Sequence, residues 1–534
     1  MSRYTSLALI FSLLAVAASA WIGTHIFENL PHIEDEITFI WQAEAIEEAG
    51  AIKLPSPPCP SCFQVPFVVD YHGERFGKYP LGWPVVLAAG IRLGIRNLVN
   101  PLLAGLGVWL TFRLGKKLLG NWVGILAAFL TLASPFFLME SSSLLSHPLT
   151  LALTLTLTLS WLDTFWPTET NAGTTLPLQP WYKRKAPPWL TALVAALSLG
   201  VLALTRPLTA VGVGLPFAIH GLTLLWRGPR RARRLVLLVG LLALLVSLLF
   251  FLWQFALTGN ALLNPYTLWW PYDKVGFGPG IGVAPNGNDL PHAITNIYVS
   301  LKTGASDLFG WGLFSWIFLP FGIWAVRRCR RAWLVGSIFP SLVLVYMAYW
   351  IGSWLLGPRY YYEGLFSLTI LSAAGIGWLA GLPISSGEND TSVAVSVSDL
   401  RFRKPDFSAL RNLYRPFSAI SLVTLLIAVS VFYYDPARIG GLKGLYGVSR
   451  SQILPFLTPQ AAASTPALVV VYPQSSWIEY GALLDLETPL LNTPFIFIIN
   501  NNPTLNQQAI AAFLGRKVID YYPNQPYTFF YPAH

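Results

Sequence analysis

Long apolar runs, separated by short polar or basic segments, follow one another along most of this sequence. Several of these runs approach the roughly 20 residues that an α-helix needs to cross a bilayer. The pattern predicts an all-α polytopic membrane protein with about eleven transmembrane helices. The predicted helices cover residues 4–27, 98–112, 121–139, 147–166, 188–204, 207–226, 235–257, 311–326, 333–355, 364–381 and 418–434.

Two segments that follow the first predicted helix do not have this spanning pattern. Between Asp35 and Ala49 apolar residues recur near helical spacing, which predicts a short helix lying on the membrane surface. Residues 80–95 are apolar but contain Pro84 and Arg92 and are followed by Arg96, so we expect an interfacial or half-buried segment there. Residues 29–97 are therefore expected to form a large first loop outside the membrane helices.

The chain after residue 434 alternates short apolar strands with helical patterns. This alternation predicts a small α/β domain at 435–534, following a transmembrane domain at 1–434. A long aromatic and glycine-rich loop is expected at 258–310, as an external flap. The predicted strands are Ala467–Tyr472, Phe495–Ile499 and Lys517–Tyr522, and the predicted helices are Trp477–Leu484 and Gln507–Leu514.

Composition supports a membrane protein. The chain has 534 residues, of which 54% are hydrophobic and 11% charged, and its mean hydropathy is +0.53. Soluble domains are about a quarter charged. The net charge of +10 comes from basic clusters between the predicted helices, with no basic and aromatic RNA-binding motif. We therefore expect membrane lipids as partners, and no nucleic acid.

The basic clusters also predict an orientation in the cell membrane. The apolar run behind Arg3 is too long for a typical signal peptide and is expected to stay uncleaved, with its N-terminus in the cytoplasm. Every dense Lys/Arg cluster then lies on the cytoplasmic side, as the positive-inside rule requires. The segments with candidate chemistry share the external face, together with the C-terminal domain; they are the first loop, Ser146-His147, Arg206, 258–310 and 357–363.

Three cysteines are too few for a disulfide framework. Cys59 and Cys62 form a C-x-x-C in the first loop, and Cys329 lies in a basic turn. The pair fits a local disulfide or two thiols better than half of a zinc site, because no second C-x-x-C supplies the remaining ligands.

The most informative polar stretch runs from Pro31 to Trp83. Three consecutive carboxylates, Glu34, Asp35 and Glu36, follow the first predicted membrane helix in a chain that has only 25 acidic residues. Carboxylates near a bilayer are costly unless they face water or take part in chemistry. Neighbouring like charges also push pKa values apart, which suits a general base.

Four polar motifs follow one another along the chain: Asp35-Glu36, Lys78-Tyr79-Pro80, Ser146-His147 and Gly357-Pro358-Arg359-Tyr360-Tyr361-Tyr362-Glu363. In this order they resemble the motifs of the polyprenyl-phosphate-dependent glycosyltransferases. These are the GT-C superfamily enzymes related to protein O-mannosyltransferases and to the aminoarabinose transferase of lipid A. The resemblance covers roughly the first 380 residues as a pattern of helices and loops.

The resemblance implies a role for each motif residue. Asp35 would take the proton of an acceptor hydroxyl, and Glu36 would orient the acceptor or hold a divalent metal. Arg359, and next Lys78, would hold the donor phosphate. Members of this family often carry an acidic residue where this chain has Ser146-His147, which puts metal dependence in doubt. The predicted substrate-binding residues are Lys78, Tyr79, His147, Arg206, Arg359, Tyr360 and Glu363.

The expected activity is therefore transfer of a sugar from a polyprenyl-phosphate donor to a glycan, lipid or protein acceptor on the external face. Two other classes stay open: a lipid-sugar transporter or flippase, and an oligosaccharide polymerase or ligase. A transporter would show paired halves or charges near the membrane midplane, and the sequence has no such internal repeat. The glycine-rich run 276–282 lacks the Gly-Lys-Ser/Thr ending of a nucleotide loop.

Overall fold

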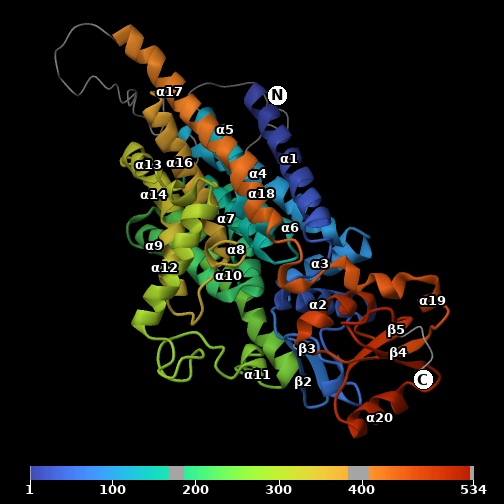
Figure 1. Ribbon diagram of the computed structural model, residues 1–534. Helices are drawn as coiled ribbons and strands as arrows, with labels where there is room; N and C mark the ends of the chain where they lie inside the picture. Colours follow the sequence, from blue (N-terminus) through green and yellow to red (C-terminus); the bar gives the residue numbers. More distant parts are fainter. Residues whose placement is uncertain (1, 167–185, 383–407, 475, 529–534) are drawn as a thin grey trace, which may run out of the picture.

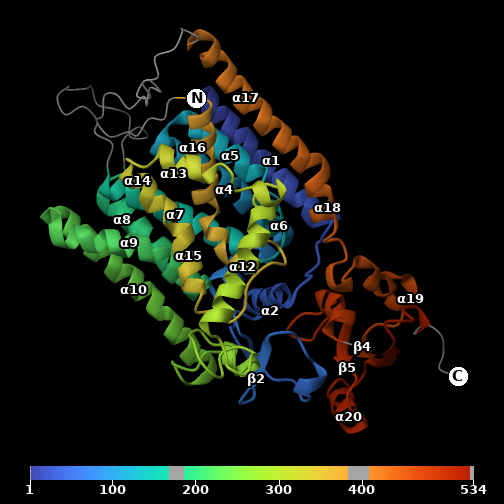
Figure 2. The same cartoon turned by 60° about the vertical axis from the view of Figure 1, so that its left-hand side comes forward.

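The computed structural model describes residues 2–166, 186–382, 408–474 and 476–528. Figure 1 shows a long bundle of helices and, at one end of it, a smaller part that contains the C-terminal strands. The N-terminus lies at the opposite end of the bundle. The view in Figure 2, turned by 60°, keeps the same two parts apart.

Six helices of the described chain are long and apolar enough to cross a membrane. Two further bent pairs raise this number to eight if each pair is one span. The chain is therefore a multi-pass, mostly helical membrane protein. Four of them are α1 (Arg3–His25), α8 (Pro188–Thr205), α9 (Pro207–Arg227) and α10 (Arg230–Thr258). The other two are Arg96–Leu119, which contains α4 (Val99–Leu119), and Tyr414–Gly440, which begins inside α17 (Ser408–Val429).

The bent pairs replace two of the predicted spans. Helices α5 (Asn121–Leu132) and α6 (Pro135–Ser142) meet at 60° around Ser134 and Pro135, because a proline cannot continue the hydrogen-bond ladder of α5. Helix α12 (Leu290–Asp307) and the segment Gly312–Ala325, which ends in α13 (Leu319–Ala325), meet at 96°.

Three other predicted spans are not among the six helices or the bent pairs. Helices α7 (His147–Phe165) and α16 (Leu365–Leu379) lie where spans were predicted, but α7 is less apolar because it is rich in threonine, and α16 has only 15 residues. The straight helix predicted at 333–355 is wrong. The chain there forms α14 (Arg330–Gly336) and α15 (Ile338–Tyr346), with Pro340 in the first turn of α15, where its missing N–H is tolerated.

The segment 258–310 is more helical than the predicted loop. It contains the short helix α11 (Tyr266–Trp269) and all of α12, whose N-terminus is capped by the Asp289 side chain. Between them, Gly276 N–H donates to the Ala348 carbonyl at 2.7 Å. This part of the segment is therefore tied to the chain that follows α15.

The first loop forms a compact unit below the bundle. It begins with α2 (Glu34–Ala49), which is helical as predicted and ends at Gly50 in a left-handed conformation. Its apolar residues Ile37 and Trp41 are buried next to Trp477 and Leu484 of the C-terminal part. An antiparallel sheet of order β1-β3-β2 follows, and then α3, whose 11 residues are too short to cross a bilayer, as predicted. The elements are β1 (Leu54–Pro55), β2 (Val68–Tyr71), β3 (Glu74–Gly77) and α3 (Gly82–Arg92).

The C-terminal part contains the three predicted strands in a parallel sheet of order β5-β4-β6. Its helix α20 (Pro503–Ala512) starts earlier than predicted, because the Asn502 side chain caps it and Pro503 fits its first turn. Residues 477–486 form two 3-10 turns instead of the predicted α-helix. The other elements are β4 (Ala467–Val471), β5 (Phe495–Ile499), β6 (Lys517–Tyr521), α18 (Asp435–Gly440) and α19 (Pro459–Ala462).

The first loop and the C-terminal part pack directly against each other. Cys59 and Cys62 form a disulfide, and both pack with Phe63 against one face of the C-terminal sheet. Arg96 forms an ion pair with the C-terminal part, and its Nη1 lies 2.8 Å from Oδ1 of Asp485. The C-terminal sheet therefore supports the loop that carries α2.

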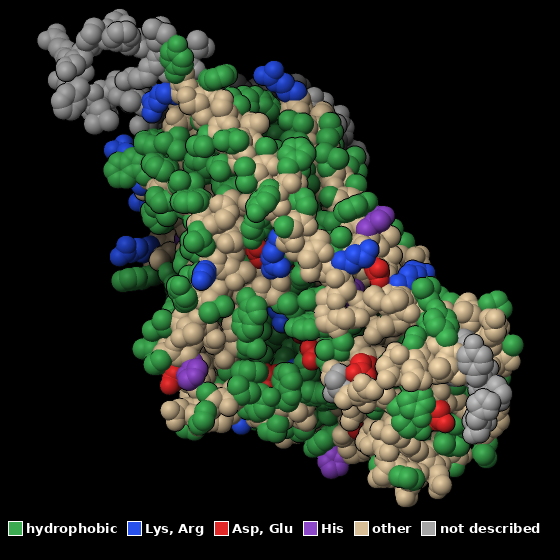
Figure 3. Space-filling model, viewed as in Figure 1, with side chains coloured by type: hydrophobic (Ala, Val, Ile, Leu, Met, Phe, Trp, Pro, Cys, Tyr) green, Lys and Arg blue, Asp and Glu red, His purple; other side chains and the backbone are tan. Residues whose placement is uncertain are grey.

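The surface of the helical part differs from that near the C-terminal part. Hydrophobic side chains cover the helical part in Figure 3, and most of the carboxylates in that view lie in its lower half, nearer the C-terminal part. Exposed leucines such as Leu13 on α1 and Leu241 on α10 belong to the apolar surface. Such a surface suits contact with lipid.

Candidate active site

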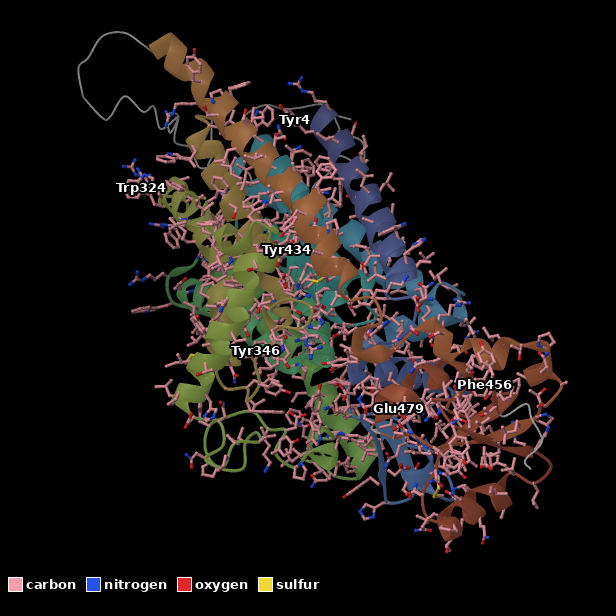
Figure 4. The ribbon with its side chains drawn as sticks, viewed as in Figure 1. Tyr4, Trp324, Tyr346, Tyr434, Phe456 and Glu479 are labelled. Carbon is pink, nitrogen blue, oxygen red and sulfur yellow. A yellow bond between two sulfur atoms is a disulfide. The ribbon has the colours of Figure 1, made fainter. Side chains whose placement is uncertain are left out.

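The predicted site residues come together at one end of the helical bundle. Helices α7, α9 and α16 begin at this end and α8 ends there, where it packs against α3 of the first loop. In Figure 4 the labelled Tyr346 lies toward this end, whereas Tyr4 and Trp324 lie at the opposite end. The structure thus gathers the residues that the sequence motifs had picked out; they are Asp35, Glu36, Lys78, Tyr79, His147, Arg206, Arg359, Tyr360 and Glu363.

Asp35 lies in the first turn of α2 and has two partners. The Tyr79 hydroxyl donates to its Oδ1 at 2.5 Å, and Arg359 Nη1 lies 3.6 Å from its Oδ2. Burial opposes ionisation of this carboxyl, but Arg359, Tyr79 and Lys78 outweigh it and hold the pKa of Asp35 below its ordinary value. Asp35 is therefore a carboxylate at neutral pH.

The chain before α3 is shaped to present Tyr79 to Asp35. The Gln42 side chain on α2 donates to the Tyr79 carbonyl at 2.8 Å. A Cβ added at Gly77 would lie 2.5 Å from Gln42 Cδ, so only glycine lets the two segments approach this closely. The Phe39 ring, also on α2, packs against the Tyr79 ring with centroids 4.6 Å apart.

Glu36 is buried and fully engaged with the backbone. Its Oε2 accepts the N–H groups of His32 at 2.7 Å and Ile33 at 3.2 Å, and its Oε1 accepts the Leu144 N–H at 2.7 Å. The sequence predicted that Glu36 orients the acceptor or holds a metal. In the structure its carboxylate joins the start of α2 to the turn before α7.

We expect Glu36→Ala to destabilise the fold by about 2 kcal/mol or more, because it leaves buried N–H groups without an acceptor. Glu36→Gln should have a smaller effect in the same direction. A thermal melt of the purified variants measures this, with Asp35→Asn as the matched control that should melt close to the wild-type protein. A Glu36→Gln protein of normal melting temperature but without activity would instead place Glu36 in the chemistry.

Lys78 is buried among aromatic rings and is paired with an acid that the sequence analysis missed. Its Nζ lies 3.2 Å from Oδ2 of Asp273, and 3.6 Å from the centroid of the Phe67 ring. Burial, which outweighs the nearby carboxylates, lowers the pKa of Lys78. Asp273 lies in an aromatic stretch without a recognisable motif. The one signal that the sequence offered for it was that acidic residues are few in segment 258–310.

A second cluster surrounds Arg206 at the junction of α8 and α9. Its guanidinium donates to Nε2 of His147 and, at 3.1 Å, to the Tyr346 hydroxyl, and its Nε lies 3.7 Å from Oε1 of Glu363. Arginine has no acceptor, so Nε2 of His147 must accept and Nδ1 must carry the proton. That Nδ1 faces Oε2 of Glu140 at 3.1 Å.

Glu140 is the other acid that the sequence analysis missed. It lies near the end of α6 and is completely buried. A carboxylate directly after the predicted membrane helix 121–139 was the available signal, since carboxylates near a bilayer are expensive unless they have a function or a partner. Among the described residues no group of three or more His, Cys, Asp or Glu side chains could hold a metal ion, so Glu140 and His147 do not complete a metal site.

Arg359 is the least engaged of the three site cations. Among the described residues, Asp35 is the only acid within 4.0 Å of its side-chain nitrogens. Its guanidinium lies 5.6 Å from the Tyr360 ring centroid, and the Tyr360 ring stacks on that of Tyr346 at 4.9 Å. An open cation beside a carboxylate and an aromatic wall is an arrangement that can receive a phosphate and a sugar.

No protein-family model matches the sequence, and no curated protein sequence matches it. Solved structures do match. ArnT from Cupriavidus metallidurans bound to undecaprenyl phosphate has a TM-score of 0.57 and 14% identity, over 97% of this chain and 90% of ArnT. ArnT in the apo state gives a TM-score of 0.56 with the same coverage.

A second match is the Archaeoglobus fulgidus oligosaccharyltransferase tethered with an acceptor peptide, with a TM-score of 0.51 and 13% identity. It involves 94% of this chain but only 64% of the oligosaccharyltransferase. The helical bundle, the first loop and the C-terminal part all fall within the region matched to ArnT, since that match spans nearly the whole chain. The chain therefore has the GT-C fold of the polyprenyl-phosphate glycosyltransferases, as the motifs of its sequence predicted.

Proposed function

We propose that this chain is a membrane glycosyltransferase that moves one sugar from a polyprenyl-phosphate donor to an acceptor hydroxyl on the external face of the membrane. The observation that carries the proposal is the Asp35 carboxylate held between the Tyr79 hydroxyl and the Arg359 guanidinium. The fold supports it, because the similar ArnT structure contains undecaprenyl phosphate.

In the proposed reaction the acceptor oxygen attacks the anomeric carbon, and Asp35 takes the hydroxyl proton. The bond between the anomeric carbon and the phosphate oxygen breaks, and the polyprenyl phosphate leaves with the electron pair. This leaving group needs no proton, and one direct displacement inverts the anomeric centre. Arg359 stabilises the charge that grows on the phosphate.

Arg359 links donor binding to the base. A phosphate that binds Arg359 competes with Asp35 for the guanidinium, so the pKa of Asp35 rises toward its ordinary value when the donor is in place. A more basic carboxylate accepts a proton more readily. The acceptor hydroxyl is therefore activated when the donor is present.

The other motif residues complete the proposed site. Lys78 and Arg206 add positive charge to the site, and His147 and Glu363 hold Arg206 in place. Tyr360 offers an aromatic wall for the sugar, and Tyr79 orients Asp35. Residues 258–310 are proposed to cover the lipid-sugar site.

We propose the orientation that the basic clusters indicate. Cysteine labelling should place Arg231, in the first turn of α10, in the cytoplasm and the exposed Gln460 of the C-terminal part outside. Position 400, outside the described residues, should also be cytoplasmic, and position 480 external. Labelling of Arg231 and Gln460 from the same side would contradict the orientation.

The activity is tested with purified protein in lipid nanodiscs and a panel of polyprenyl-phosphate sugars. Transfer releases free polyprenyl phosphate, which chromatography detects, and mass spectrometry identifies the glycosylated acceptor. Mass spectrometry of cell-envelope glycans and glycoproteins from a strain without the protein supplies the acceptor candidates. Movement of the intact lipid-sugar across the bilayer without cleavage would identify a flippase instead.

A further inference from the structure

Asp273 is a carboxylate that takes no part in the proposed chemistry, yet both of its oxygens are engaged. Its side chain is buried, with only 3% of the residue exposed. Oδ1 accepts from the Tyr349 hydroxyl at 3.0 Å and from Trp350 Nε1 at 3.1 Å, while Oδ2 faces Lys78 Nζ at 3.2 Å. One side chain thus joins three segments that are far apart in the sequence.

The Lys78 ammonium is enclosed by rings from the same segments. It lies 3.6 Å from the centroid of Phe67 in the first loop, and 5.0 Å and 4.9 Å from those of Tyr266 and Trp270 in segment 258–310. Aromatic faces attract a cation but cannot neutralise it. Asp273 supplies the neutralising charge for this buried cation.

Two hydrogen bonds to the backbone of Gly276 fix the segment that carries Asp273. Gly276 N–H donates to the Ala348 carbonyl, and the Asn288 side-chain amide donates to the Gly276 carbonyl at 2.8 Å. The backbone near Asp273 is therefore fixed, and its carboxylate contacts Lys78 of the first loop.

We propose that Asp273 is a positioning residue of the transfer site: by holding Lys78 it fixes Tyr79, the next residue along the chain, and through the Tyr79 hydroxyl it fixes the base Asp35. This inference rests on the proposed function. It gives the buried ion pair between Lys78 and Asp273 a role in catalysis. Stability alone explains such a pair poorly, because apolar side chains of similar size are often as stabilising.

The contacts that connect Asp273 to Asp35 form a short, continuous chain. Asp273 contacts Lys78, the backbone joins Lys78 to Tyr79, and Tyr79 donates to Asp35 at 2.5 Å. The ammonium has three N–H groups, and Asp273 takes one of them. Lys78 thus keeps donors for a phosphate while its position is set by Asp273.

The test compares Asp273→Asn, Lys78→Met and the double variant in the transfer assay. Each single change should lower kcat/KM by roughly tenfold to a hundredfold, because a small displacement of the base is enough for that loss. The loss should fall mainly on kcat, and the double variant should be no worse than the poorer single one. Losses that multiply in the double variant would overturn the proposal, since Lys78 would then act independently of Asp273.

Asp289→Asn is the matched control. It makes the same change in the same segment, but Asp289 is exposed, and asparagine can still cap α12. Its kcat/KM should equal that of the wild-type protein. A loss in Asp289→Asn as large as in Asp273→Asn would assign the effect to the segment as a whole and overturn the specific role of Asp273.

A second measurement does not depend on activity. Hydrogen exchange should become faster in the peptides that cover residues 67–79, 266–282 and 346–350 of Asp273→Asn, and stay unchanged in Asp289→Asn. Unchanged exchange in Asp273→Asn would overturn the inference even if sugar transfer is confirmed. If the wild-type protein transfers no sugar with any donor, the proposed function fails, and with it the catalytic role of Asp273, while faster exchange would still establish the junction itself.

Discussion

Asp35→Asn is expected to lower turnover by on the order of a hundredfold or more while donor binding stays largely intact. The substitution keeps the shape of the side chain and removes the group that accepts the proton. Asp35→Glu should also be impaired, because the longer side chain moves the carboxylate away from the Tyr79 hydroxyl, 2.5 Å from Oδ1 in the native protein. Steady-state kinetics with a polyprenyl-phosphate sugar, and separate donor-binding titrations, measure both effects.

Glu34→Gln is the control for this prediction. Glu34 precedes Asp35 in the same turn of α2, so the change removes a carboxylate at almost the same place without removing the proposed base. Its turnover should stay near normal. If Asp35→Asn has near-normal turnover and Glu36→Gln is inactive, Glu36 is the base and Asp35 is not. Full activity in both variants would refute the mechanism.

Arg359→Ala is expected to lower turnover on the order of a hundredfold to a thousandfold, as the loss of one charge-stabilising donor does in other active sites. Arg359→Lys should restore only part of the activity, because lysine lacks the planar fork that binds a phosphate through two donors. Lys274→Ala removes an exposed cation of segment 258–310 and should leave turnover unchanged. Full activity in Arg359→Ala would remove this residue from the mechanism.

The same variant should change the pH dependence of the residual activity. Arg359 is the strongest of the groups that lower the pKa of Asp35 against the opposing effect of burial. Without Arg359 the pKa of Asp35 rises, so the carboxylate is protonated at a higher pH and the acidic limb of kcat/KM moves upward. An acidic limb that does not move in Arg359→Ala would mean that another group is the base.

The sequence by itself determined the elements whose pattern is local. The helix α2, the non-spanning helix α3 and the three C-terminal strands follow from apolar spacing over a few residues. The motif residues Asp35, Tyr79 and Arg359 could also be chosen in advance, because charged or polar groups next to membrane helices are rare enough to stand out.

Tertiary structure alone decided where helices break and which charges meet. Hydropathy predicted straight spans, yet α5 and α6 bend at Pro135, and the stretch after α14 breaks up although it is apolar. Lys78 pairs with Asp273 across 195 residues, and Glu36 accepts the Leu144 N–H across 108. Local patterns carry no information about such pairs, because a buried charge is satisfied by whichever partner the packed helices and loops bring within a few ångströms of it.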